Sequence, residues 1–180
     1  MIATTIGAVA SMTERMLGAS KLHAPTYEEI EADVTATPQA FGVVVLSSVA
    51  AGIGAGAGLA GLLGGAITSL LLWYVWAYLT FWIGTRMLAE PQTRSNYGEV
   101  LRTIGFATAP GILRVLGVIP FLRGLVFVGT AIWMLIGAVI AIRQAMDYQS
   151  TGRAALVVFI GWLVQMVILS IVFSLLGIRL

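Results

Sequence analysis

A run of 52 residues, from Val34 to Thr85, carries no charged side chain. A single helix of that length would be about 78 Å long at 1.5 Å per residue, whereas the hydrocarbon core of a bilayer is about 30 Å thick. The run therefore predicts two membrane crossings joined by a turn. We expect the first crossing near residues 41–60 and the second near 67–85, with the turn at the glycine-rich segment 61–65.

Two further crossings are predicted in the C-terminal part of the chain. Residues 121–142 carry Arg123 near their start and are followed by Arg143, and residues 154–178 are free of charge and are followed by Arg179. Both segments are long enough to span a bilayer, and arginines at the ends of a span can reach the polar interfaces.

A weaker apolar segment lies between these two pairs of crossings. Only eleven uncharged residues separate Arg102 from Arg114, and Pro110-Gly111 interrupts any helix there. In one interpretation the segment is a complete crossing that is kinked at Pro110, with the two arginines extending toward opposite interfaces. In the other it is a re-entrant element that enters the membrane and returns to the same side.

The composition agrees with a membrane protein and excludes several classes. Apolar residues make up 59% of the chain and charged residues 10%, whereas soluble domains have about 45–50% and about 25%. One lysine and nine arginines are spread along the chain, so there is no basic patch for nucleic acid. The sequence therefore predicts an all-α, polytopic membrane helix bundle with five transmembrane helices, the third of them broken by proline.

The N-terminal segment, residues 1–37, precedes this five-helix domain, residues 38–180. Ile2, Ile6, Val9 and Met16 recur at near-helical spacing, which favours an amphipathic helix lying on the membrane or against the bundle, although a frayed tail remains open. No basic region precedes the apolar start, so we do not expect a cleavable signal peptide. Thr26, three residues before Glu29, is typical of a capping box at the start of a short helix.

The distribution of basic residues predicts the orientation. With a cytoplasmic N-terminus and five crossings, seven basic residues fall on the cytoplasmic side and three on the other. The seven are Lys21 and six arginines: Arg15, Arg86, Arg94, Arg102, Arg143 and Arg153. Because basic residues are in excess in cytoplasmic loops, we expect a multi-pass protein of the cell membrane with its N-terminus in the cytoplasm.

Glycines cluster around the end of the first predicted crossing. They form three pairs spaced by four residues, which we place on adjacent faces of one helix: Gly52/Gly56, Gly54/Gly58 and Gly61/Gly65. Such pairs let helices approach closely in lipid. They serve either a contact with a partner or a second copy, or packing within the protein's own bundle.

Charged residues gather on the predicted cytoplasmic side. We expect local pairs of Arg86 with Glu90, Glu99 with Arg102, and Arg143 with Asp147, each of which also fits a solvated helix end. Together with an acidic run they form a candidate docking face for another protein, which comprises Glu28, Glu29, Glu31, Asp33, Arg143 and Asp147.

The chain offers few groups for chemistry. His23 is the only histidine, cysteine is absent, and no carboxylate pair accompanies the histidine. No motif for a serine nucleophile, a zinc protease or a phosphate-binding loop occurs. We therefore expect no enzymatic activity, no metal and no cofactor.

Three segments of the chain carry a family resemblance. They are APTYEEIEADVTATPQA before the first crossing, YGEVLRTIGFATAPGILRVLGVIP through the third, and AIRQAMDYQSTGRAALVVFIGW between the last two. The middle one, with Tyr97, Leu101, Gly105, Phe106 and Pro110 followed by Pro120, is similar to the pattern Y-x-x-V-L-x-x-x-G-[YF]-x-x-x-P of the Yip1 domain family. The resemblance implies a five-helix bundle with a cytoplasmic N-terminus.

Eukaryotic members of that family have a larger cytoplasmic region and are associated with prenylated Rab GTPases. With only about 40 residues before its first crossing, this chain more closely resembles the short prokaryotic members, so Rab binding is not carried over.

Three functional hypotheses follow from the sequence. The first is a non-enzymatic scaffold or accessory subunit that contacts other integral membrane proteins or itself, together with lipids. The second is a small-solute or ion transporter or channel, favoured by the broken third span and the glycine-rich segment. The third is a lipid- or pigment-contacting subunit that uses Trp73, Trp76 and Trp82 as a platform.

Overall fold

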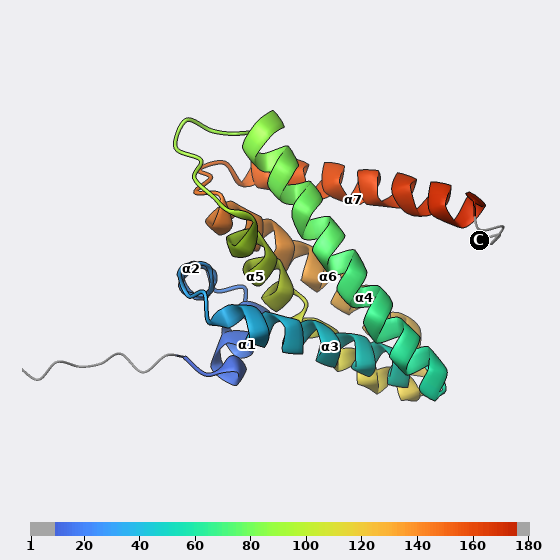
Figure 1. Ribbon diagram of the computed structural model, residues 1–180. Helices are drawn as coiled ribbons and strands as arrows, with labels where there is room; N and C mark the ends of the chain where they lie inside the picture. Colours follow the sequence, from blue (N-terminus) through green and yellow to red (C-terminus); the bar gives the residue numbers. More distant parts are fainter. Residues whose placement is uncertain (1–9, 176–180) are drawn as a thin grey trace, which may run out of the picture.

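The computed structural model describes residues 10–175, and all regular elements within them are helices (Figure 1). Two short helices come first, α1 (Met12–Ser20) and α2 (Ala24–Ala32). They are followed by α3 (Ala36–Ala55), α4 (Leu59–Trp82) with its π-helical continuation η1 (Ile83–Met87), α5 (Tyr97–Ala107) with its 3-10 continuation η2 (Ala109–Val118), α6 (Pro120–Ala145) and α7 (Thr151–Leu175).

Five of these segments are long and apolar enough to cross a membrane. They are Ala36–Ala55, Leu59–Met87, Tyr97–Val118, Pro120–Ala145 and Thr151–Val172. The predicted all-α bundle with five transmembrane helices is thus confirmed. The last predicted residues of the fifth crossing, 176–178, lie outside the described residues.

The third segment traverses the bundle from end to end and changes helix type midway. The α-helical part ends at Ala107, and the chain continues as a 3-10 helix beyond Thr108. Pro110 has no N–H to donate and disfavours an α conformation in the residue before it, which explains the change. The segment does not turn back, because Gly117 at its far end packs against Gly54, close to the end of α3. The re-entrant interpretation was therefore wrong.

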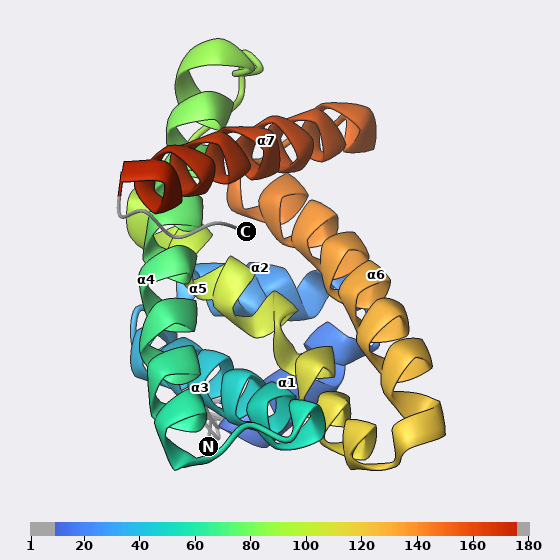
Figure 2. The ribbon, with the colours of Figure 1, turned by 90° about the vertical axis from the view of Figure 1, so that its right-hand side faces the viewer.

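Helix α5 forms the centre of the molecule. All eight residues from Val100 to Ala107 are buried, and Figure 2 shows this helix inside a frame made by α4, α6 and α7. The indole N–H of Trp73 on α4 donates to the carbonyl oxygen of Leu101 at 3.1 Å. Trp73 is only 4% exposed, so it belongs to the core.

The turn between the first two crossings lies at residues 56–58, earlier than the predicted segment 61–65. Gly56 ends α3 with a φ of 77°, a left-handed conformation that favours glycine. The first crossing therefore runs from Ala36 to Ala55, five residues before the predicted 41–60. The prediction that the six glycines share one helix was wrong, because Gly61 and Gly65 belong to α4.

The described part of the N-terminal segment packs on the bundle. Met12 and Met16 of α1 lie against the hydrophobic core, while Ile2, Ile6 and Val9 of the predicted amphipathic pattern lie outside the described residues. The indole N–H of Trp133 in α6 donates to the carbonyl oxygen of Ser20 at the end of α1 (2.8 Å). The amphipathic helix was predicted to lie on the membrane or against the bundle, and residues 12–20 lie against the bundle.

The expected capping box of Thr26 and Glu29 does not form. Helix α2 begins at Ala24 with His23 as its N-cap residue, and no side chain caps it. Capping boxes do form at Ser11–Glu14, before α1, and at Asn96–Glu99, before α5. Pro25 in the first turn of α2 explains the earlier start, since proline is well tolerated there.

Candidate functional site

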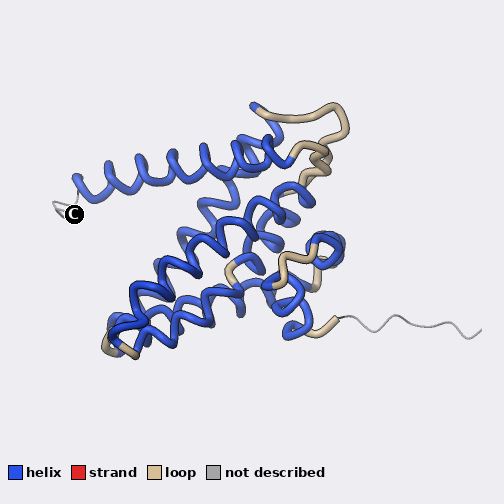
Figure 3. The backbone as a smooth tube through the Cα atoms, turned by 180° about the vertical axis from the view of Figure 1, so that it is seen from behind, coloured by secondary structure: helices blue, strands red, loops and turns tan. Residues whose placement is uncertain are grey.

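One end of the bundle, here called the loop end, gathers α2 and the connecting segments 88–96 and 146–150. Figure 3 shows these two segments beside each other. Glu90 pairs with the guanidinium of Arg153 at 3.3 Å and accepts the backbone N–H of Gln149 at 2.9 Å. The bond from Gln149 is the main reason why the pKa of Glu90 lies below its usual range. The expected pair of Glu90 with Arg86 does not form among the ion pairs of the described residues.

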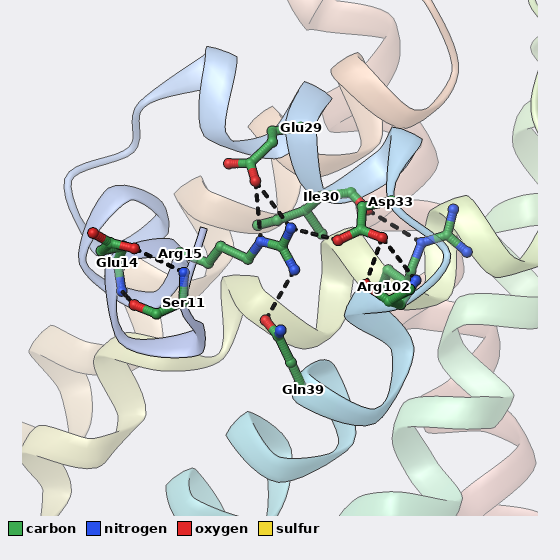
Figure 4. Close-up of polar contacts among 9 residues, drawn as sticks. Ser11, Glu14, Arg15, Glu29, Ile30, Asp33, Gln39 and Arg102 are labelled. Carbon is green, nitrogen blue, oxygen red and sulfur yellow. Dashed lines mark hydrogen bonds and ion pairs between the residues drawn. The ribbon is translucent and has the colours of Figure 1, made fainter. Parts of the chain in front are cut away.

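Arg15 fastens the N-terminal helices to one another and to α3 (Figure 4). Its guanidinium donates to Glu29 at 2.9 Å, to Asp33 at 2.5 Å and to the side-chain oxygen of Gln39 at 3.0 Å. The Arg15 side chain is only 1% exposed. The hydroxyl of Thr35 and then this guanidinium lower the pKa of Asp33 to about 2. Glu29 and Asp33, predicted to belong to a docking face, are therefore engaged within the molecule.

Arg102 of α5 makes a second link between helices, through hydrogen bonds to the C-terminal end of α2. Its Nε donates to the carbonyl oxygen of Ile30 at 3.1 Å, and one Nη donates to the carbonyl oxygen of Glu31. A cation is favourable at this end of a helix, where carbonyl groups lack partners within the helix. Arg102 is 4% exposed. It lies at the loop end, so its predicted position near that interface stays a prediction, whereas the expected pair with Glu99 does not occur among the described ion pairs. Glu99 instead closes the capping box of α5.

Four carboxylates remain at the loop end and form the acidic cluster: Glu28, Glu31, Glu99 and Asp147. Partial burial and then repulsion from the other three raise the pKa of Glu31 to about 7, against an opposing effect of Arg102. Glu28 accepts a hydrogen bond from Gln144 at 2.6 Å. Arg143 donates to the carbonyl oxygen of Tyr148 at 3.3 Å, and the expected pair with Asp147 does not occur among the described ion pairs.

The structure divides the candidate glycines into two groups. Gly52 and Gly54 are packed inside: a Cβ added to Gly54 would lie 1.8 Å from the carbonyl oxygen of Arg114, and one added to Gly52 would lie 2.6 Å from Leu62. Gly58 and Gly65 have no atom within 4 Å of such a Cβ, and Gly61 meets only Ala57 of the turn. The first group serves the protein's own packing, and the second leaves room for another molecule.

A cavity lies beside the break in the third span. It consists of two hollows of about 510 and 590 Å³ that share Trp76, Ile104, Thr108, Arg114 and Met134. Thr108 is the C-cap residue of α5. Pro110 and Gly111 lie outside this lining, and Gly111 packs against Ser47 of α3. The cavity and the position of Arg114 in its lining were not predicted. Arg114 is flanked by apolar residues within a span, which is a sequence pattern that indicates a functional site.

The described residues contain no group of three or more histidine, cysteine, aspartate or glutamate side chains that could hold a metal ion. His23 contacts the hydroxyl of Thr26 through Nδ1 at 3.1 Å. The absence of a metal, a cofactor and an enzymatic reaction stays a prediction.

Comparison with known proteins supports the resemblance seen in the sequence. The model of the Yip1 domain matches residues 3–173, which is nearly the whole chain. No curated protein and no solved structure showed a significant match. Together with five membrane-spanning helices and the proline-broken third span, this match shows that the chain belongs to the Yip1 domain family.

Proposed function

We propose that this protein is a non-enzymatic scaffold or accessory subunit of a larger membrane assembly, and that its loop end docks the partner. The protein lies in the cell membrane with its N-terminus and its loop end in the cytoplasm. The partner is another integral membrane protein that carries basic residues on its cytoplasmic side.

The acidic cluster carries this proposal. Glu31 lies near three other carboxylates, and partial burial followed by repulsion from them raises its pKa to about 7. Like charges in proximity destabilise the isolated protein, and basic side chains of a partner would relieve that repulsion. Arg102 donates to two carbonyl groups at the end of α2, and its positive charge only partly offsets the effects that raise the pKa of Glu31.

Several polar groups of the bundle have structural partners, which supports a role in packing. Arg15 joins three helices, and Trp73 joins α4 to α5. The buried hydroxyls of Thr80 and Thr103 donate to carbonyl groups of their own helices.

The outer surface of α4 supports a membrane location and offers contacts to neighbouring helices. Leu59, Leu63, Ile67 and Leu71 are each more than half exposed and follow one another at intervals of four residues. Such a row lies along one face of a helix, where it meets lipid or another transmembrane helix.

The docking claim is tested by co-purification from native membranes with gentle detergent. We expect the same protein to be recovered with the wild type and with Glu14→Gln, and to be largely lost with the triple variant Glu28→Gln, Glu31→Gln, Asp147→Asn. Glu14 is an exposed carboxylate outside the acidic cluster, and glutamine also suits its capping position. Full retention of the partner by a folded triple variant would contradict docking at the acidic cluster.

A small-solute or ion transporter is the second candidate, favoured by the cavity beside the broken third span. Its test is solute flux into reconstituted vesicles. Flux that is present in the wild type and lost on replacement of Pro110 would favour transport over scaffolding.

A further inference from the structure

Arg114 directs its guanidinium into the bundle. Its Nε donates to the hydroxyl of Thr130 at 2.9 Å, and its Cζ lies 5.4 Å from the centre of the Phe127 ring. Thr130 is ten residues beyond the start of α6, so it lies about 15 Å along that helix, inside the hydrocarbon core rather than at its surface. The prediction that Arg114 extends toward an interface was therefore wrong.

This cation is partly buried and has no ion-pair partner among the described residues. The ion pairs there involve Arg15 and Arg153, both of which lie far from Arg114 in the N-terminal segment and at the loop end. An arginine inside the hydrocarbon core is unfavourable unless an anion or water compensates its charge. The contacts with Thr130 and Phe127 are neutral ones, so no negative charge among the described residues pairs with this cation.

Polar groups line the hollow next to Arg114. The hollow of about 510 Å³ is bordered by Arg114 and by Ser47, Ser69 and Gln165. Gln165 is 9% exposed, and its side-chain oxygen has no hydrogen-bond partner; the same is true of the indole N–H of Trp76, which borders both hollows. Unpartnered buried polar atoms are uncommon in folded proteins. The indole N–H of Trp76 is a donor that suits a phosphate oxygen, whereas the Gln165 oxygen is an acceptor that suits a hydroxyl group.

The second hollow is apolar and opens toward the lipid. Ile132, Leu135, Phe159 and Trp162 line it, and each is about half exposed on α6 or α7. These residues border the cavity and also face the membrane, so the cavity can be entered from the bilayer between α6 and α7. Figure 2 shows these two helices as two sides of the frame around α5. The volume of about 590 Å³ lies within the range of about 300–1,000 Å³ of ligand sites. A hydrocarbon chain can enter there without passing through water.

We propose that this cavity binds an anionic phospholipid. The phosphate of the head group accepts hydrogen bonds from the Arg114 guanidinium in the polar hollow, and one acyl chain occupies the apolar hollow between α6 and α7. The lipid supplies the negative charge that the described residues do not, and its chain fills a space that water would enter only at a cost. This site is separate from the acidic cluster, so it stands independently of docking at the loop end.

The first test measures lipid retention. The protein is reconstituted in phosphatidylcholine nanodiscs that contain a minor fraction of phosphatidylglycerol, then extracted, and the retained lipids are counted by native mass spectrometry. We expect the wild type to retain phosphatidylglycerol in excess of its share, and Arg114→Gln to lower this excess about tenfold, as loss of a charged hydrogen bond does. Arg123→Gln is the control, because Arg123 is exposed and absent from the lining of either hollow.

A second pair of variants fills the cavity without touching the charge. Gly65 lines the polar hollow and Gly64 does not, and a Cβ on either meets no atom within 4 Å. We expect Gly65→Leu to expel the lipid and Gly64→Leu to retain it, with both variants folded. This pair keeps the proposal testable if Arg114→Gln fails to fold.

Three results would overturn the proposal. The first is an equal excess of phosphatidylglycerol in the wild type and in folded Arg114→Gln or Gly65→Leu. The second is release of the lipid by inorganic phosphate, which would make the site one for a free anion. The third is retention of phosphatidylcholine and phosphatidylglycerol in proportion to their supply, which would indicate ordinary lipid contact.

Discussion

Three arginines near apolar sequence have different surroundings in the structure: Arg15, Arg102 and Arg114. The first two neutralise carboxylates or cap carbonyl groups where the N-terminal helices meet the bundle. The third points into the bundle. The sequence indicates how far a residue lies from the end of a helix, but the direction of a long side chain depends on partners from distant segments. For that reason the spans were predictable and the roles of these arginines were not.

Replacement of Arg15 tests its role at the residue scale. We expect Arg15→Gln to destabilise the protein by about 2–3 kcal/mol, which is less than for a fully buried pair because both carboxylate partners are partly exposed. Thermal unfolding in detergent measures the loss, and limited proteolysis shows whether α1 is released. Lys21→Gln, at an exposed position, should change neither. Equal stability of Arg15→Gln and the wild type would show that the ion pairs contribute little.

Glu31 gives the fold a pH dependence. Its pKa is about 7 in the folded protein and 4.5 in the reference state, so the folded protein holds the proton more tightly. The resulting stabilisation is complete below about pH 4.5 and is lost as the pH rises toward 7. Glu31→Gln removes this dependence because glutamine stays neutral.

We therefore expect the melting temperature of the wild type to fall relative to Glu31→Gln between about pH 5 and pH 8. The expected difference is about 2–4 °C, which corresponds to about 1 kcal/mol in a chain of this size after allowance for solvent screening. Glu14→Gln is the control. The pKa of Glu14 is lowered, so the titration of Glu14 changes stability at lower pH values than that of Glu31. Parallel pH curves for the wild type and Glu31→Gln would contradict the raised pKa.

At the scale of elements, apolar runs located the helices well and the turns less well. The fourth crossing was predicted at 121–142 and is observed at Pro120–Ala145, because charges and proline bound it clearly. The first turn was misplaced because glycines between 52 and 65 allow several turns. Which glycine ends α3 depends on the approach of α3 to η2 at Gly54, a contact distant in sequence. The short helices α1 and α2 depend on Arg15 and Arg102 in the same way.

The packing of α3 against η2 is tested by Gly54→Ala. The added Cβ would lie 1.8 Å from the carbonyl oxygen of Arg114, so the two backbones must separate. We expect a loss of about 1–3 kcal/mol or more in unfolding free energy, as for overpacking in a core. Gly64→Ala meets open space and removes a flexible residue from a helix, so it should leave stability unchanged or raise it. A Gly54→Ala protein as stable as Gly64→Ala would contradict the close approach.

For the whole molecule, the arrangement of the helix ends defines two sides. The start of α3, the end of η1 and the loops 88–96 and 146–150 belong to the loop end, whereas the turn at 56–58 and the start of α6 belong to the opposite end. The number of crossings and the family were predictable from apolar runs and from the motif around Pro110. The cavity was not, because it arises from the separation of α4, α6 and α7 around the bend of the third span, which no local pattern encodes.

The orientation is checked with reporter fusions. We expect reporters inserted in the segments 88–96 and 146–150 to give cytoplasmic signals, because basic residues are in excess on that side. Reporters at the turn 56–58 and after the C-terminus should give signals from the other side. A cytoplasmic signal from the C-terminal fusion would contradict five crossings with a cytoplasmic N-terminus.

The central functional claim is that the protein works as part of a larger membrane assembly. Its most direct test is the native mass of the particle extracted gently from its own membranes. We predict a particle of defined stoichiometry that contains this chain together with another membrane protein, and that loses this protein when Glu28, Glu31 and Asp147 are neutralised. A particle with the mass of a single chain, with no bound protein in any gentle detergent, would contradict the proposed function.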